Sequence, residues 1–293
     1  MPSVNVVYGD KIVVRSVGPV ERAFRFYAKP FAQVWVNRDI VQAILRREIS
    51  ERFKSSVIGW MWAVVAPLLA IVVYTYAFTT SLKLPITESA TMGPKLGYAL
   101  FIFSGIVVFN FWSEMAYRAP MLLHEYVNFI KQTIFPSDML VVISTLRATL
   151  YTLISVVVML LFQLGATGTL PWTVLLLPLI FIPFMAFLMG MSWFLSAIGA
   201  FTRDAGYLMI NIVPIFMFAT PVFFPHDALP APFDFWIYLN ALTGYVEVTR
   251  DIVLLGKLPN WWVYGWSLVT SVVSFYFGYW FFDRYRNVIV DVI

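Results

Sequence analysis

Residues that could do chemistry are few in this 293-residue sequence, and they form no catalytic pattern. The two histidines, His124 and His226, stand far apart, and the acidic residues fall almost entirely between the apolar runs. Cysteine does not occur, which excludes disulfides, thiol catalysis and cysteine-based metal sites. The phosphate-binding motif G-x-x-x-x-G-K-[ST] is also missing, so the chain cannot hydrolyse ATP by that route. We therefore expect no catalytic residue, no metal site and no cofactor in this chain.

Arg147 is the one charged residue that falls well inside an apolar run. Transporters driven by protons or sodium usually carry ionisable residues at the bilayer midplane, and no other residue here comes close to that depth. Arg147 has two interpretations. Its charged head could extend back to the membrane surface, or it could line a path for an anionic substrate.

Aromatic side chains are abundant, with 27 Phe, 15 Tyr and 11 Trp. Residues four apart share a helix face, so Tyr74 and Phe78 of the first apolar run can point the same way. Such rings either stack on sugars along a path or belong to the aromatic belts at membrane interfaces. We predict a channel lining made of Trp60, Tyr74, Phe78 and Arg147, with a lipid-facing belt as the alternative for the aromatic residues.

The elements that position these residues must be membrane helices. Hydrophobic residues make up 60% of the chain and charged residues only 12%, whereas about 25% is usual in a soluble domain. A bilayer-spanning helix needs about 20 mainly apolar residues. Six runs qualify: Val57–Thr80, Leu96–Ser113, Met139–Leu164, Trp172–Ala200, Ala205–Phe224 and Trp261–Phe282. Small residues recur at every fourth position of the fourth run, at Ser192, Ser196 and Ala200, and this spacing predicts close helix packing.

The distribution of Lys and Arg predicts the orientation. Six spans place both termini on one side, and most basic residues then fall on that side. The opposite side receives only Lys83, Lys95, Arg250 and Lys257. Cytoplasmic segments carry this excess of positive charge, so we expect both termini in the cytoplasm. The net charge of +4 is explained by this pattern and does not indicate nucleic acid.

The N-terminal part divides into an extension, residues 1–38, and an amphipathic helix, residues 39–54, before the six-span domain of residues 55–293. Two β-prone runs within Asn5–Val14 favour a hairpin. Between residues 39 and 53 the apolar residues recur at helical spacing beside several arginines, which predicts a basic helix lying in the membrane surface.

Two connections between spans have structure of their own. Residues 118–138 mix charged and apolar residues, which indicates a short amphipathic helix. Residues 226–260 are moderately polar and broken by three prolines, which fits re-entrant half-helices on the outer side.

Five segments in order resemble the permease subunits of polysaccharide ABC exporters, of the Wzm (O-antigen), KpsM (capsule) and TagG (teichoic acid) types. They are Arg52–Phe78, Ile134–Pro136, FTRDAGYL at 201–208, TPVFFP at 220–225 and LNALTGYVEVTRDIVLLG at 239–256. Ala241 departs from the proline usual in the last segment. The resemblance covers about residues 46–282.

The resemblance implies a homodimer with two separate cytoplasmic ATPase subunits, which use ATP and magnesium. It also implies a lipid-linked polysaccharide as substrate, on an undecaprenyl or a phospholipid anchor, and the bacterial inner membrane as location. A permease without a nucleotide site must be driven by its ATPase subunits through contacts on the cytoplasmic side. We therefore predict that ATPase coupling involves His124, Glu125, Tyr126, Arg203 and Asp204. We predict a re-entrant gate that involves Asn240, Glu247 and Arg250.

Two other classes remain open. An integral-membrane glycosyl- or acyltransferase would need clustered His, Asp or Glu at one membrane face, and no such cluster is visible. An ABC permease of the same fold could instead export a small drug or a lipid, because a fold does not determine its cargo. Among polysaccharides we rank O-antigen first, ahead of capsule and teichoic acid.

Overall fold

The computed structural model describes residues 4–8, 11–15, 29–52, 54, 56–81, 94–132, 136–226, 230 and 237–293. The chain divides into two compact units, residues 1–44 and residues 45–293. In the first unit, β1 (Val4–Tyr8) pairs antiparallel with β2 (Lys11–Arg15). This pairing confirms the predicted hairpin. The predicted amphipathic segment is also a helix, α2 (Arg38–Glu51), which begins in the first unit and ends in the second.

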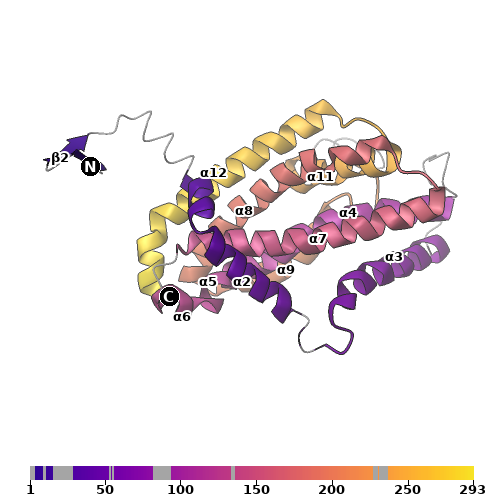
Figure 1. Cartoon of the computed structure of the whole chain (residues 1–293). Coiled ribbons are helices and arrows are strands. Elements are labelled where there is room, and N and C mark those ends of the chain that lie inside the picture. Colours follow the sequence, from indigo (N-terminus) through magenta and orange to yellow (C-terminus); the bar gives the residue numbers. More distant parts are fainter. Residues whose placement is uncertain are drawn as a thin grey trace. The chain divides into compact units, whose positions relative to one another are not determined.

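The second unit is built from long apolar helices (Figure 1). They are α3 (Trp62–Ser81), α4 (Pro94–Arg118), α7 (Asp138–Thr167), α8 (Leu177–Phe201), α9 (Asp204–Ala219) and α12 (Trp261–Val292). Among the described residues, three stretches are long and apolar enough to cross a membrane: Gly97–Glu125, Asp138–Thr167 and Trp172–Phe201. Shorter apolar helices cover Gly59–Tyr74 and Asp204–Ala219. The predicted all-α architecture is therefore confirmed for the described part of this unit.

Several helix ends differ from the predicted spans: α3 begins at Trp62, α4 ends at Arg118 and α8 begins at Leu177. Two further differences have a clear physical reason. α9 ends at Ala219 rather than Phe224, because Thr220 adopts an extended conformation before Pro221. The residue before a proline is disfavoured in a helix, which explains this end. α12 continues past Phe282 to Val292. Charged residues follow Phe282, but no glycine or proline does, so nothing interrupts the helix.

α8 and α12 approach each other through glycines. A Cβ atom at Gly190 of α8 would overlap the carbonyl of Ser274, and one at Gly278 of α12 would overlap the carbonyl of Gly190. Nearby, the buried ring of Trp193 lies 5.2 Å from that of Phe275 and 5.1 Å from that of Tyr279, centroid to centroid. The predicted packing positions Ser192, Ser196 and Ala200 are all buried. α8 and α12 therefore pack backbone against backbone at this contact.

Two connections are themselves helical. The first contains η2 (Ala119–Met121), α5 (Leu122–Glu125) and α6 (Val127–Gln132), which confirms the helix predicted within residues 118–138. The second contains η5 (Ile237–Leu239), α11 (Ala241–Arg250) and a π-helical turn (Asp251–Leu255). Most of α11 is buried, and it packs against α4 and α12.

Candidate functional site

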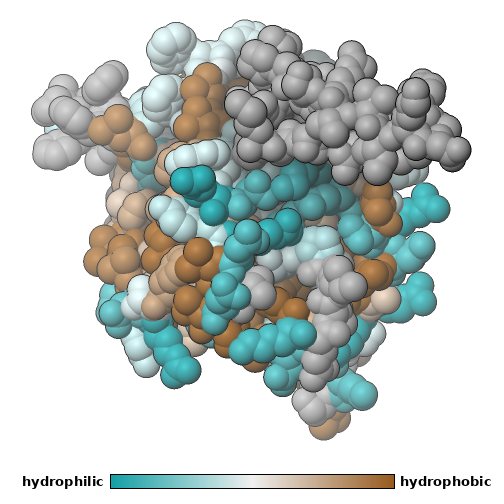
Figure 2. All heavy atoms as spheres, turned by 90° about the vertical axis from the view of Figure 1, so that its left-hand side faces the viewer, coloured by the Kyte–Doolittle hydropathy of each residue, from teal (hydrophilic) through white to brown (hydrophobic). Residues whose placement is uncertain are grey.

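Charged side chains from α2, α4 and α7 meet at the end of the helices that carries α5 and α6. Figure 2 views this end and shows hydrophilic side chains gathered on it. We call Glu48, Arg52, Glu114, Arg118 and Arg147 the ionic cluster. At its centre Arg118 donates two hydrogen bonds to the Glu48 carboxylate, from Nη2 to Oε1 (2.8 Å) and from Nη1 to Oε2 (2.9 Å). This two-pronged geometry is the strongest arrangement of an arginine on a carboxylate.

The cluster continues from Glu48 toward α3. Arg147 Nε lies 3.6 Å from Glu48 Oε2, and Arg147 Nη2 lies 3.1 Å from Glu114 Oε1. Arg52 Nη1 lies 2.9 Å from the same Glu114 oxygen, and its guanidinium carbon lies 4.0 Å from the centre of the Tyr151 ring. The ion pairs thus join residues that are distant in sequence into one chain of alternating charge.

Hydrogen bonds and ion pairs, acting against burial, set the protonation state at the centre of the cluster. The Glu48 side chain is only 5% exposed. Burial alone raises the pKa of Glu48, but hydrogen bonds from Arg118 and Tyr126 and the charge of Arg147 outweigh it and lower that pKa below its ordinary value. Burial, followed by the Glu48 carboxylate, raises the pKa of Tyr126. The Glu48 carboxylate therefore stays charged near neutral pH, and the Tyr126 hydroxyl stays a donor.

Two predicted coupling residues of the first connection, Glu125 and Tyr126, contact this cluster, and the third, His124, contacts α8. Tyr126 donates a short hydrogen bond to Glu48 Oε1. The half-exposed Glu125 carboxylate lies 3.2 Å from Arg118 Nη2. His124 Nε2 lies 3.1 Å from the Gly199 carbonyl of α8. A Cβ atom at Gly199 would overlap the Pro120 backbone, so α8 and this connection are in direct contact.

The other predicted coupling residues, Arg203 and Asp204, are exposed in the turn between α8 and α9. Arg203 precedes α9 and Asp204 is its first residue. α9 also contacts η2, so the structure brings this turn to the same end as the first connection. Their role in coupling stays a prediction.

The predicted gate residues gather where α9 ends. Asn240 caps α11, since its Oδ1 accepts a hydrogen bond from the Leu242 amide (3.0 Å), and its Nδ2 donates to Thr220 Oγ1 (2.7 Å). Glu247 lies between two partners: Tyr238 Oη donates to its Oε2 (2.8 Å), and His226 Nδ1 lies 2.8 Å from its Oε1. These contacts hold α11 against the TPVFFP segment.

Arg250 ties three segments together at the same place. Its residue is 5% exposed, and its Nη2 donates to the Val222 carbonyl (2.6 Å). Its Nε donates to the Phe101 carbonyl of α4 (3.3 Å), and its guanidinium carbon lies 3.6 Å from the centre of the Phe101 ring. A Cβ atom at Gly105 would lie 2.8 Å from Nη2, so a glycine there leaves room for the guanidinium. Whether these segments move as a gate stays a prediction.

The predicted channel-lining residues do not form one surface that the structure defines. Trp60 is 48% exposed, with its ring 6.5 Å from that of Tyr151. Tyr74 is partly buried against the core, and the Phe78 side chain lies outside the described residues. Arg147 belongs to the ionic cluster, where its side chain is 15% exposed. Their lining role stays a prediction.

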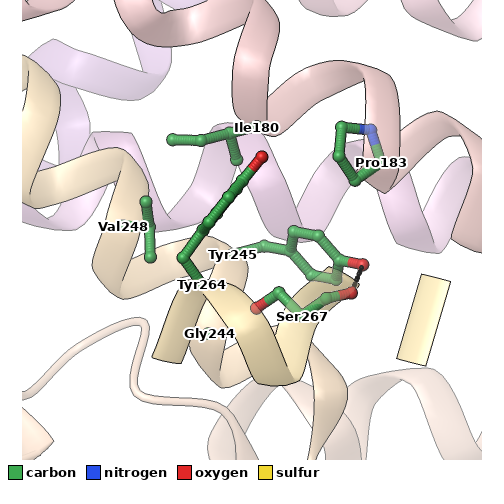
Figure 3. A pocket seen from close by; sticks show the side chains of 7 residues that line it. All are labelled: Ile180, Pro183, Gly244, Tyr245, Val248, Tyr264 and Ser267. Carbon is green, nitrogen blue, oxygen red and sulfur yellow. Dashed lines mark hydrogen bonds between the residues drawn. The ribbon is translucent and has the colours of Figure 1, made fainter. Parts of the chain in front are cut away.

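A small recess between α8, α11 and α12 offers no chemistry. It is lined by Ile180, Pro183, Gly244, Tyr245, Val248, Tyr264 and Ser267 (Figure 3). Its hydroxyl groups already have partners: Tyr245 donates to the Ser267 carbonyl (3.0 Å), Tyr264 to the Leu179 carbonyl (3.1 Å) and Ser267 to the Val263 carbonyl (3.0 Å). Nor do the described residues contain a group of three His, Asp or Glu side chains that could hold a metal ion.

Sequence reasoning missed Glu48, the centre of the ionic cluster. A signal for it exists in the sequence. Glu48 stands four residues after Ile44 and seven after Val41, so it falls within the apolar stripe of the helix instead of the charged face. A carboxylate in that position needs a buried partner, because an unpaired charge is costly to bury.

The apolar helices and their helical connections define a polytopic membrane protein. The chain belongs to the ABC-2 type transporter family, which residues 40–254 match.

Three relatives show which transporters this chain is similar to. It is 27% identical over 222 residues to an O-antigen export system permease protein RfbA of Klebsiella pneumoniae, covering 75% of this chain and 82% of that protein. A protein of the same name from Myxococcus xanthus is 23% identical over 230 residues, covering 78% and 85%. The polysialic acid transport protein KpsM of Escherichia coli is 22% identical over 247 residues, covering 83% and 92%. The predicted resemblance to this group of permeases is confirmed.

Proposed function

We propose that this chain is the transmembrane subunit of an ABC transporter that exports a lipid-linked polysaccharide, O-antigen before capsule or teichoic acid, across the bacterial inner membrane. The observation that carries the proposal is the similarity to O-antigen permeases along most of their length. In this proposal the chain acts as a homodimer with two ATPase subunits, which hydrolyse ATP with magnesium. The substrate is carried on an undecaprenyl anchor.

Deleting the gene tests the function. We expect the strain to lose surface polysaccharide and to accumulate lipid-linked glycan inside the cell, because synthesis continues while export stops. Tagged protein should co-purify with an ATPase subunit. Loss of glycan synthesis without accumulation would favour the transferase alternative. Unchanged surface polysaccharide would favour a drug or lipid as cargo.

The proposed topology has six spans, α3, α4, α7, α8, α9 and α12, with both termini cytoplasmic. Residues 38–51 then lie along the inner membrane surface, and α11 is re-entrant from the outer side. The asymmetry of Lys and Arg supports this orientation. Reporter fusions after Lys83, Gly168 and Lys257 should read as external, and fusions after Lys131 and Arg203 as cytoplasmic. An external reading at Arg203 would contradict the model of six spans.

A further inference from the structure

Together with Glu125, which pairs with Arg118, the ionic cluster forms a path with two exposed ends and a buried centre. At one end is Glu125, the last residue of α5, with a side chain that is 45% exposed. We call the segment of η2, α5 and α6 the α5 connection. At the other end Arg52, which precedes the first span, has a side chain that is 40% exposed. Glu48 lies between them and is 5% exposed. Glu48 is the residue that joins the Arg118 ion pairs to Arg147, and α4, which carries both Arg118 and Glu114, is the other connection between the two ends.

Each ion pair along this path joins two different elements. Arg118, the last residue of α4, bonds both Glu125 and Glu48, so the α5 connection is tied to α2. Arg147 then links Glu48 to α7, and Glu114 links α7 to Arg52. Three arginines alternate with three glutamates along this path, so each contact joins two opposite charges. The central pairs of Glu48 with Arg118 and Arg147 are buried and hold their geometry, because a misplaced charge would lie unpaired in an apolar surrounding.

We propose that Glu48 is a positioning residue that transmits movement of the α5 connection to α7, at Arg147, and to Arg52 ahead of span α3. This inference rests on the proposed function, in which an ATPase subunit pushes on the connection around Glu125 and Tyr126. The subunit does not touch Glu48. Glu48 instead keeps α2, the α5 connection and α7 moving as one body.

The test replaces Glu48 by glutamine in the full chain, expressed with its ATPase subunit in the deletion strain. Glutamine keeps the shape of the side chain but removes the charge that pairs with Arg118 and Arg147. We expect surface polysaccharide per transporter to fall about tenfold, a typical size for a lost coupling. We expect the amount of co-purified ATPase subunit and its ATP hydrolysis to stay unchanged. Tyr126→Phe, which removes only the hydroxyl that donates to Glu48, should lower export in the same way but less.

Glu51→Gln is the matched control. Glu51 stands on the same helix, and its half-exposed carboxylate pairs with Arg47 at 2.8 Å, away from the cluster. The control should export as the wild type does. The proposal is overturned if Glu48→Gln exports as well as Glu51→Gln, or if export and co-purified ATPase subunit fall in parallel, which is the result of a merely structural role. If no ATPase subunit co-purifies with the wild-type chain, the proposed function is overturned instead.

Discussion

Gly278→Ala should destabilise the protein by about 3 kcal/mol, the upper part of the range for overpacking a core. The added methyl group would overlap the backbone carbonyl of Gly190 on α8. Backbone cannot rotate away as a side chain can, so α8 and α12 must separate along their contact. Alanine gains about 1 kcal/mol over glycine in helix propensity, which is too little to offset the overlap. The loss can be measured as a lower midpoint of thermal unfolding in detergent.

Gly265→Ala provides a control within the same helix. Gly265 also lies in α12, but a Cβ atom there would meet nothing within 4 Å. The substitution adds the same methyl group and the same helix propensity, so we expect equal or slightly higher stability. If Gly278→Ala were as stable as Gly265→Ala, the close approach of α8 and α12 would be wrong.

The long helices could be predicted because each follows an apolar run in the sequence. The end of α9 was missed because the apolar run continues through Thr220 and Pro221, so hydropathy alone does not mark the turn. The extension of α12 past Phe282 was missed for the opposite reason. Its charged residues end the apolar run but do not end the helix.

The contacts between helices could not be predicted in the same way. Arg147 stands alone in its apolar run, and its partners Glu48 and Glu114 come from other helices. The contact of Gly190 with Gly278 depends on how α8 and α12 are rotated, which neither helix encodes by itself. Local patterns therefore predict elements, whereas pairings across the core need the three-dimensional structure.

Arg286→Gln should destabilise the protein by about 3 kcal/mol, because it leaves the buried Asp138 carboxylate without its partner. Asp138 is the first residue of α7, and its side chain is 2% exposed. The N-terminus of α7 still favours a negative charge, but this effect contributes only about 0.3–1 kcal/mol. The unpaired charge therefore dominates. Arg284→Gln, an exposed arginine on the same helix, is the control and should leave the unfolding midpoint unchanged.

A second substitution distinguishes loss of the Asp138–Arg286 ion pair from disturbed packing at the end of α12. If the loss comes from an unpaired carboxylate, adding Asp138→Asn to Arg286→Gln should restore more than half of it, because the charge that lacked a partner is gone. If the loss comes from disturbed packing, the double variant should be less stable than either single variant. Asp138→Asn alone should cost less than Arg286→Gln, because the Arg286 side chain is 22% exposed and its charge can reach water. A double variant whose loss equals the sum of the two single losses would show that Asp138 and Arg286 are not coupled.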